Sequence, residues 1–205
     1  EEYNGSSWTE SGDLNQVRVY LGGTGSQTAG LAAGGRNTGP PGPESSNVEE
    51  YNGSSWTNVT ALPKAMRNNR MCGPQTAALG AGGYQGYYPG SNIATTYEYD
   101  GTNWTAGGTM NTARNQVNGW GGPAGQTASM CGGGNDGSVT GATEGYDGTS
   151  WSTRPNLATA RQGSANGIGT SQTTGIQAGG STGSYVTNTE EFTGETTSVN
   201  SVDIT

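Results

Sequence analysis

The carboxylates are the residues of this chain best suited to acid–base chemistry, because its 205 residues include no histidine. Without histidine, the Ser-His-Asp and Cys-His catalytic arrangements and the usual zinc, copper and iron ligand sets are excluded. Two carboxylates could still form a glycosidase pair. However, a glutamate recurs near an aromatic residue along the chain, at Glu2, Glu50, Glu98, Glu144 and Glu191. Repeated residues are typical of a scaffold, so we predict a non-enzymatic protein with no catalytic residue, no metal site and no cofactor.

Arginine also recurs, and each copy follows a tryptophan by 10 or 11 residues: Arg18, Arg67, Arg114 and Arg161. A ring of arginines at the mouth of a channel could bind an anion. Alternatively, each arginine pairs with a glutamate or with carbonyls of the neighbouring repeat. Because the position is the same in all four repeats, we predict the structural role.

Charge and composition exclude two classes of partner. The formal net charge is −8, and the eight basic residues are scattered. Nucleic-acid binding requires clustered Lys and Arg, so we predict no nucleic-acid partner. No apolar run approaches the ~18 residues of a transmembrane helix, so membrane insertion is not expected. Cys72 and Cys131 can form a disulfide or remain as buried free thiols, and we predict free thiols.

These residues are positioned by an internal repeat. The pattern Tyr-(Asn/Asp)-Gly-x-x-Trp begins at Tyr3, Tyr51, Tyr99 and Tyr146, and an eroded copy spans 192–197. The Trp-to-Trp spacings are 48, 48 and 47 residues, which indicates a repeat architecture. Asn-Gly and Asp-Gly favour a turn that needs a positive φ, so each copy predicts a hairpin with Tyr and Trp on its two strands.

A second pair of landmarks lies inside each repeat. A Gln-Thr pair begins at Gln27, Gln75, Gln126 and Gln172, and a Gly-Gly pair follows six residues after its threonine. The segment from Arg to Gly-Gly reads as another hairpin, made of small residues that allow close backbone approach. Each repeat therefore predicts four short strands, here called a to d. The chain contains 39 glycines, and the segments between them show no apolar periodicity of 3.6 residues, so no helix is predicted.

Four strands per repeat of this length predict a β-propeller blade. The Gly-Gly pair, the spaced Tyr, the Trp five residues later and the Arg of the next unit resemble the kelch repeat. The resemblance covers nearly the whole chain and implies radial antiparallel blades whose a strands line a central channel. The short Gly-rich strands and the Gln-Thr pair depart from kelch. In this respect the chain is similar to the kelch-like repeats of marine bacteriophage tail and fibre proteins.

The predicted fold is therefore an all-β, kelch-like β-propeller of about four four-stranded blades with an extra N-terminal outer hairpin. Residues 1–13 form that outer hairpin of a preceding or shared blade. Residues 14–205 form four repeats, at about 14–61, 62–109, 110–156 and 157–205. Because outer hairpins outnumber inner ones, we expect the C-terminal part of a larger propeller. A ring closed by a shared blade and an open or interlocking array are the alternatives.

Binding residues are expected in the loops between strands b and c, which differ most between repeats. Tyr84, Tyr87 and Tyr88 give one of these loops a composition typical of recognition or sugar-stacking surfaces, although they could instead pack on the loop itself or on a neighbouring chain. Trp120 lies outside the repeat register, where it either fills the core or stacks on a ligand. A turn explains the oxygen ligands around Asp136 better than calcium does. The candidate binding residues are Arg36, Tyr84, Tyr87, Tyr88, Trp120, Asp136 and Tyr185.

The resemblance to phage proteins implies a non-enzymatic structural or display module of a virion, in a tail or fibre, that contacts a host surface receptor or glycan. Its partners would be other virion proteins or copies of itself, and its localisation the virion or the extracellular space. A secreted lectin-like adhesin of a marine bacterium is the alternative, and a carbohydrate-active enzyme is a remote one.

Overall fold

The structure is a computed structural model, and it describes residues 1–37, 42–86, 89–120, 125–164, 168–171 and 173–194. Within these ranges every regular element is a β-strand. None of these residues forms a helix long and apolar enough to cross a membrane.

The described strands form four main antiparallel sheets, which we call blades and list from inner to outer strand. Blade 1 contains β4 (Gly22–Ser26), β5 (Ala29–Ala33), β7 (Val48–Tyr51) and β8 (Trp56–Val59). Blade 2 contains β9 (Arg70–Cys72), β10 (Ala78–Ala81), β13 (Thr96–Tyr99) and β14 (Trp104–Ala106). Blade 3 contains β15 (Asn118–Trp120), β16 (Ser129–Gly132), β17 (Thr143–Tyr146) and β18 (Trp151–Arg154). The described part of blade 4 contains β19 (Ile168–Ser171), β20 (Thr174–Ala178) and β21 (Thr189–Phe192).

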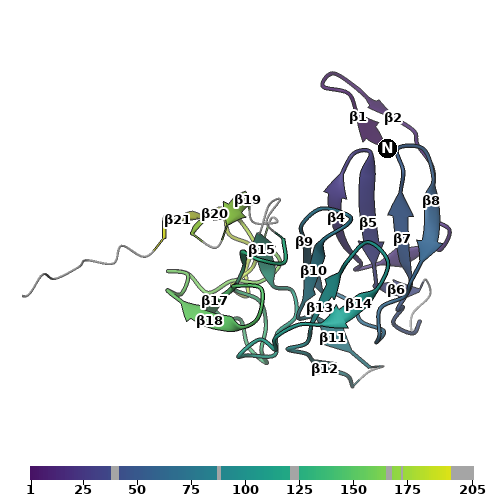
Figure 1. Cartoon of the computed structure of the whole chain (residues 1–205). Coiled ribbons are helices and arrows are strands. Elements are labelled where there is room, and N and C mark those ends of the chain that lie inside the picture. The colour runs from purple at the N-terminus through teal and green to yellow at the C-terminus, as the bar shows by residue number, and fades with distance from the viewer. Residues whose placement is uncertain (38–41, 87–88, 121–124, 165–167, 172, 195–205) are drawn as a thin grey trace, which may run out of the picture.

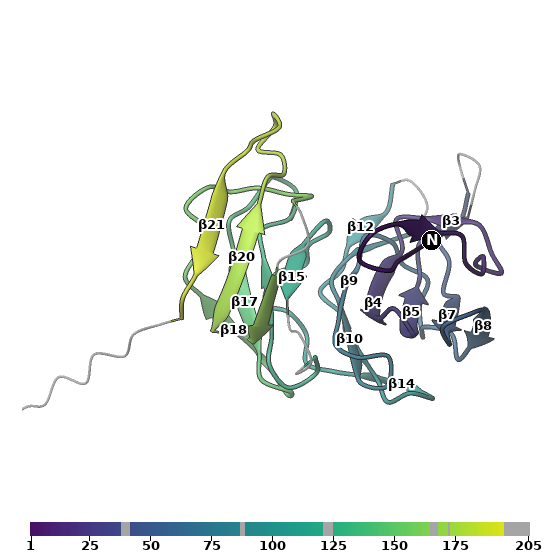
Figure 2. The ribbon, with the colours of Figure 1, turned by 90° about the horizontal axis from the view of Figure 1, so that it is seen from above.

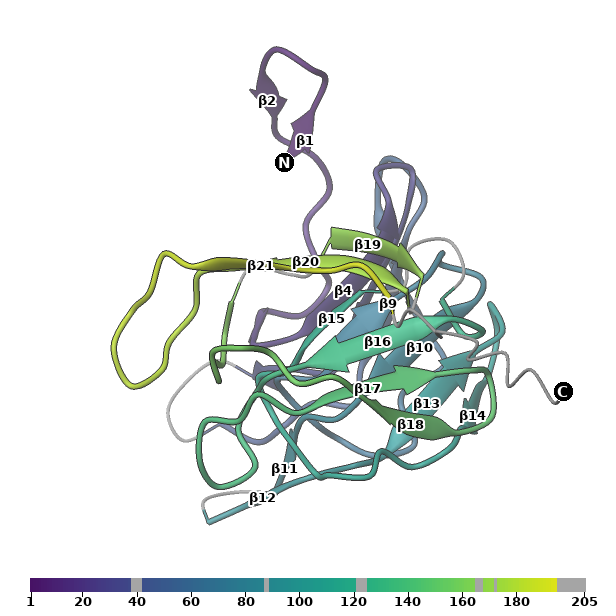
Figure 3. The same ribbon diagram turned by 90° about the vertical axis from the view of Figure 1, so that its left-hand side faces the viewer.

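Three smaller sheets have two strands each among the described residues. They are β1 (Glu2–Tyr3) with β2 (Trp8–Thr9), β3 (Arg18–Val19) with β6 (Arg36–Asn37), and β11 (Tyr84–Gln85) with β12 (Ser91–Asn92). The β1–β2 hairpin is the predicted extra outer hairpin, and it projects from the rest of the molecule (Figure 3).

The blades follow one another in sequence order, from blade 1 at the right of Figure 1 to blade 4 at the left. Figure 2 shows the same succession from above. The inner strands of successive blades are in contact, β4 with β9, β9 with β15 and β15 with β19. The fold is therefore all-β and propeller-like, as predicted.

The outer hairpins are built as the sequence indicates. In blade 1, Tyr51 lies opposite Trp56 and their rings are 5.0 Å apart between centroids. Gly53 in the turn has a φ of +93°, which explains the glycine. The side-chain oxygen of Asn52 accepts the N–H groups of Ser54 and Ser55, which explains why the turn begins with Asn or Asp.

The Gly-Gly pairs of blades 1, 2 and 3 each join their blade to the next one. The N–H of Gly83 in blade 2 donates to the carbonyl of Arg114 (2.8 Å), at the entrance to blade 3. A Cβ on the preceding Gly82 would lie only 2.8 Å from the same oxygen. The Gly-Gly pair is therefore required by close approach of two backbones, as well as by the positive φ of both residues.

The glutamines also join neighbouring blades. Gln75 Nε2 donates to the carbonyls of Gly30 in strand b and Tyr51 in strand c of blade 1 (2.9 and 3.0 Å). Gln126 repeats this contact with blade 2. A tryptophan adds to the contact between blades 1 and 2, because Trp104 Nε1 donates to the carbonyl of Thr60 (3.1 Å), at the end of blade 1. Trp104 therefore contacts the neighbouring blade.

The predicted arginine set is wrong at one member. Arg18, Arg114 and Arg161 are buried, and each pairs with a glutamate of its own blade, which confirms a structural role. Their carbonyl partners also lie in their own blade, not in a neighbouring one. In blade 2 the equivalent residue is Met66. Its carbonyl accepts the N–H of Gly35, just as the carbonyl of Arg114 accepts the N–H of Gly83. Arg67 lies one residue later and pairs with Glu44 (2.8 Å) near the surface.

The glutamates also fall into two sets, not one. Tyr99 donates to Glu50 (2.8 Å) and Tyr146 to Glu98 (2.6 Å), so that each tyrosine hydroxyl reaches a glutamate of the preceding blade. Tyr51 reaches Glu2 in the same way. Glu144 instead occupies the arginine-paired position, which Glu49 holds in blade 1 and Glu190 in blade 4. The spacing marks this difference, because Glu144 lies two residues before its tyrosine, whereas Glu50 and Glu98 lie one residue before theirs.

Small and apolar residues form the core between the blades. The larger cluster lies between blades 1 and 2 and includes Leu31, Val48, Met71 and Tyr99. Cys72 and Cys131 lie in the second cluster, and both are free and buried, as predicted. Burial raises the pKa of the Cys131 thiol to about 12, so the thiol stays protonated at neutral pH.

Candidate functional site

The b–c loops share one end of the blades, which we call the loop face. Their described residues are 34–37, 42–47, 82–86, 89–95, 133–142 and 179–188, and each loop begins with a Gly-Gly pair. The antiparallel order of every blade places these loops at one end and the Tyr-to-Trp turns at the other. The loops of blades 2 and 3 are joined, because Asn92 Nδ2 donates to the carbonyl of Asn135 (2.9 Å). The loop face is therefore continuous across these two blades.

Two arginine–tyrosine stacks lie on the loop face. The guanidinium of Arg36 lies over the ring of Tyr20, 5.5 Å from its centroid. The guanidinium of Arg67 lies over the ring of Tyr84 at 4.6 Å. The two stacks are adjacent in the fold, since Asn68 donates its N–H to the carbonyl of Tyr20 (2.9 Å). Stacking of this kind orders long side chains at a surface.

Each stack is supported by backbone pairing. Val19 pairs with Arg36 between β3 and β6, and Arg67 forms the equivalent bridge with Tyr84 in blade 2. The Tyr84 hydroxyl accepts the N–H of Gly90 (2.9 Å), so its ring is held by its own loop. Tyr84 was expected either to form a recognition surface or to pack on its own loop or a neighbouring chain. Its hydroxyl packs on its own loop, while its ring faces Arg67.

The other predicted binding residues are not gathered at these stacks. Asp136 accepts the N–H of Ser138 (3.2 Å) within a turn of the blade 3 loop. Tyr185 is 96% exposed on the blade 4 loop. Trp120 belongs to β15, an inner strand, and its side chain is outside the described residues. Tyr87 and Tyr88 are also outside the described residues.

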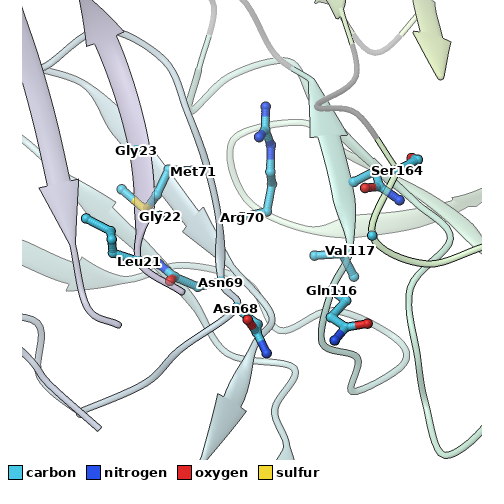
Figure 4. A pocket seen from close by; sticks show the side chains of 12 residues that line it. Leu21, Gly22, Gly23, Asn68, Asn69, Arg70, Met71, Gln116, Val117 and Ser164 are labelled. Atoms are coloured by element: carbon cyan, nitrogen blue, oxygen red, sulfur yellow. The ribbon is translucent and has the colours of Figure 1, made fainter. Parts of the chain in front are cut away.

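A second candidate site lies between the inner strands. A cavity of about 220 Å³ is lined by equivalent segments of all four blades, among them Asn69, Arg70 and Asn118. Figure 4 shows the Arg70 side chain extending from β9 into the space between blades 1 and 3. Burial lowers the pKa of the Arg70 guanidinium, because a charged group is poorly solvated there.

None of these three residues was predicted from the sequence as a binding residue. The predicted arginine set drew attention to Arg67, although a constant spacing of ten residues from each tryptophan leads to Arg18, Met66, Arg114 and Arg161. With that register, Arg70 corresponds to Gly22 in blade 1 and Asn118 in blade 3. The signal available in the sequence was a basic residue at a position that holds glycine in blade 1 and asparagine in blade 3.

The carboxylates described in the blades are already bonded to neighbouring groups. Glu49 and Glu144 receive an arginine and backbone N–H groups, while Glu50 and Glu98 receive a tyrosine hydroxyl. Among the described residues no three His, Cys, Asp or Glu side chains are grouped so as to hold a metal ion.

Comparison with known proteins adds no relative from which a role could be transferred. No protein-family model matches the chain. No curated protein matches it significantly either.

Proposed function

We propose that this chain is a non-catalytic display module, a rigid propeller-like scaffold whose loop face contacts a glycan or receptor at a host surface. The kelch-like and phage-like features of its sequence favour a place in a virion tail or fibre. The observation that carries the proposal is the pair of adjacent Arg–Tyr stacks on the loop face, formed by Arg36 with Tyr20 and Arg67 with Tyr84.

The scaffold beneath the stacks supports this role. The Gly-Gly pairs, the glutamines and the tyrosine–glutamate contacts all join one blade to the next, so the loops are held at fixed positions. Tyr20 is 57% exposed, and a partly exposed aromatic ring offers a face on which a sugar ring can stack. Pre-ordered side chains lose less entropy on binding than free ones do.

Engagement of the carboxylates supports a non-catalytic role. An acid–base pair for glycoside hydrolysis needs two carboxyl groups that face the substrate. Glu49 and Glu144 instead hold buried arginines. Glu50 and Glu98 accept hydroxyl groups from the next blade.

A glycan array with three proteins tests the proposal. We expect the wild-type chain to bind a subset of surface polysaccharides, and Tyr20→Ala to lose at least tenfold in affinity. Tyr3→Ala is the matched control, because Tyr3 is also exposed but lies on the β1–β2 hairpin. An array with no bound glycan, or equal loss in both variants, contradicts recognition by the loop face.

Location is tested separately. Mass spectrometry of purified phage particles should detect peptides of this chain if it is a virion component. Detection only in the culture medium of a bacterium would favour the secreted adhesin instead.

A further inference from the structure

Arg70 differs from the paired buried arginines in having no carboxylate beside it. Arg18, Arg114 and Arg161 each form an ion pair with a glutamate, whereas no such pair includes Arg70 among the described residues. Its Nε is enclosed and has no hydrogen-bond partner in the described part of the chain, which is also true of Arg18 and Arg114, but those two reach a glutamate through Nη2. Arg70 as a whole is only partly buried, and a partly enclosed guanidinium without a carboxylate beside it favours an anion in the space in front of it.

Two amide side chains in the same cavity share this feature. Asn69 is 7% exposed, and neither its Nδ2 nor its Oδ1 has a partner among the described residues. Asn118 is 2% exposed, and its Nδ2 is likewise unpartnered there. Buried polar groups are nearly always hydrogen-bonded. Eight described residues carry such atoms, and three of the eight line this one cavity, which favours a polar molecule bound between them.

The chemistry of the three side chains defines that molecule. A guanidinium presents a planar fork of N–H donors that fits a carboxylate. An amide with a free donor and a free acceptor suits a hydroxyl group, which can accept and donate in return. The volume of about 220 Å³ corresponds to roughly seven waters, enough for a ligand of monosaccharide size.

Apolar and backbone surfaces complete the cavity. Leu21 and Val117 also line it and offer contact to the carbon skeleton of a ligand. Gly119 makes room for Arg70, because a Cβ there would lie 2.5 Å from Arg70 Cγ and 3.1 Å from its Nε. Arg70 therefore packs against β15 at a position where only glycine leaves enough space for its side chain.

We propose that this cavity binds a small hydroxylated carboxylate such as a uronic acid, with Arg70 on the carboxylate and Asn69 and Asn118 on hydroxyl groups. The site lies between the inner strands and uses none of the four residues of the Arg–Tyr stacks. It can therefore be present whether or not the loop face binds a host surface.

Isothermal titration with three probes tests the ligand class. Glucuronate is expected to bind with a Kd of about 1 mM, as small ligands of this size do. Glucose lacks the carboxylate, and inorganic phosphate lacks both the planar carboxylate and the carbon skeleton, so both should bind at least tenfold more weakly. Equal binding of glucose and glucuronate, or tighter binding of phosphate, would overturn the proposal.

Two variants locate the binding. Arg70→Gln should abolish measurable glucuronate binding, whereas Lys64→Gln makes the same charge change at an exposed residue of blade 2 and should leave it unchanged. In the absence of ligand, Arg70→Gln should not lower the Tm, because it removes a partly buried charge that no carboxylate compensates. Glucuronate binding that survives Arg70→Gln, or a Tm several degrees lower in that variant, would show that Arg70 serves the fold instead.

Discussion

Blades 2 and 3 place different residues at the same buried position. In blade 3, Arg114 donates to Glu144 and to the carbonyls of Gly133 and Ala142. In blade 2, Met66 and Tyr97 stand at the equivalent places, and both are buried in the apolar cluster. The backbone around both pairs is the same, since Met66 and Arg114 each accept an N–H from the preceding Gly-Gly pair.

The difference shows that the position requires a matched pair and not a particular chemistry. A buried ion pair can often be replaced by apolar residues of similar size, whereas removal of one partner leaves an uncompensated charge. Arginine and glutamate are accordingly exchanged together in blade 2. The blade-to-blade contacts made by the backbone do not change with the exchange.

The largest effect is expected from breaking the pair in blade 3. Arg114→Met should lower the free energy of unfolding by about 3 kcal/mol, because Glu144 would remain buried without its cation. Urea denaturation measures this loss. The double variant Arg114→Met/Glu144→Tyr copies blade 2 and should recover most of the stability. A double variant as unstable as the sum of its two single variants would refute the exchange.

The reverse exchange in blade 2 should behave in the same way. Met66→Arg alone should cost about 2–3 kcal/mol, because Tyr97 offers no carboxylate to the new charge. Tyr97→Glu added to Met66→Arg should restore part of that loss. Thermal unfolding of the three variants checks this, and a restored pair that gives no recovery would indicate that blade 2 packs differently.

Glycine substitutions test whether the backbone contact is common to both blades. A Cβ on Gly82 would lie 2.8 Å from the Arg114 oxygen, and one on Gly133 would lie 2.4 Å from the Arg161 oxygen. Gly82→Ala and Gly133→Ala should therefore each cost about 2 kcal/mol. Gly148→Ala is the control: its φ is also positive, but its nearest neighbour is 3.6 Å away, and about 1 kcal/mol is expected. Equal losses at all three would mean that φ alone requires glycine.

The tyrosine–glutamate contacts should give the smallest effect. Tyr146→Phe removes the hydrogen bond to Glu98 and should cost about 1 kcal/mol. Burial and this hydrogen bond raise the pKa of Tyr146 to about 12, above the ordinary ~10. The contribution is therefore complete below pH ~10 and is lost as the pH rises through 12. Unfolding measured between pH 9 and 11 should show a steeper decline in wild type than in Tyr146→Phe.

Blade 4 provides a natural control for these contacts. Its aromatic residue is Phe192, which has no hydroxyl, and the residue before Tyr146 in blade 3 is Gly145, which has no carboxylate. The donor and the acceptor are thus absent together. The two members of this contact are therefore replaced together, just as the arginine and the glutamate are replaced together by Met66 and Tyr97 in blade 2.

Much of the fold was predictable because it depends on local chemistry. The hairpin turns follow from Asn-Gly and Asp-Gly, since a positive φ and a capping oxygen act within six residues. The arrangement around the candidate site depends on contacts between distant segments. Arg36 and Tyr84 lie on the loop face as expected, but their stacking partners Tyr20 and Arg67 come from segments 16 and 17 residues earlier.

The sequence by itself determined the repeat, its strands and its turns, because these depend on short-range backbone preferences and on spacing. Only the tertiary structure decided which residues are equivalent. It placed Met66, and not Arg67, at the buried position, because burial and backbone contacts act between segments far apart in the chain. It also brought Asn69, Arg70 and Asn118 into one cavity, because they come from two different blades and no local pattern marks them.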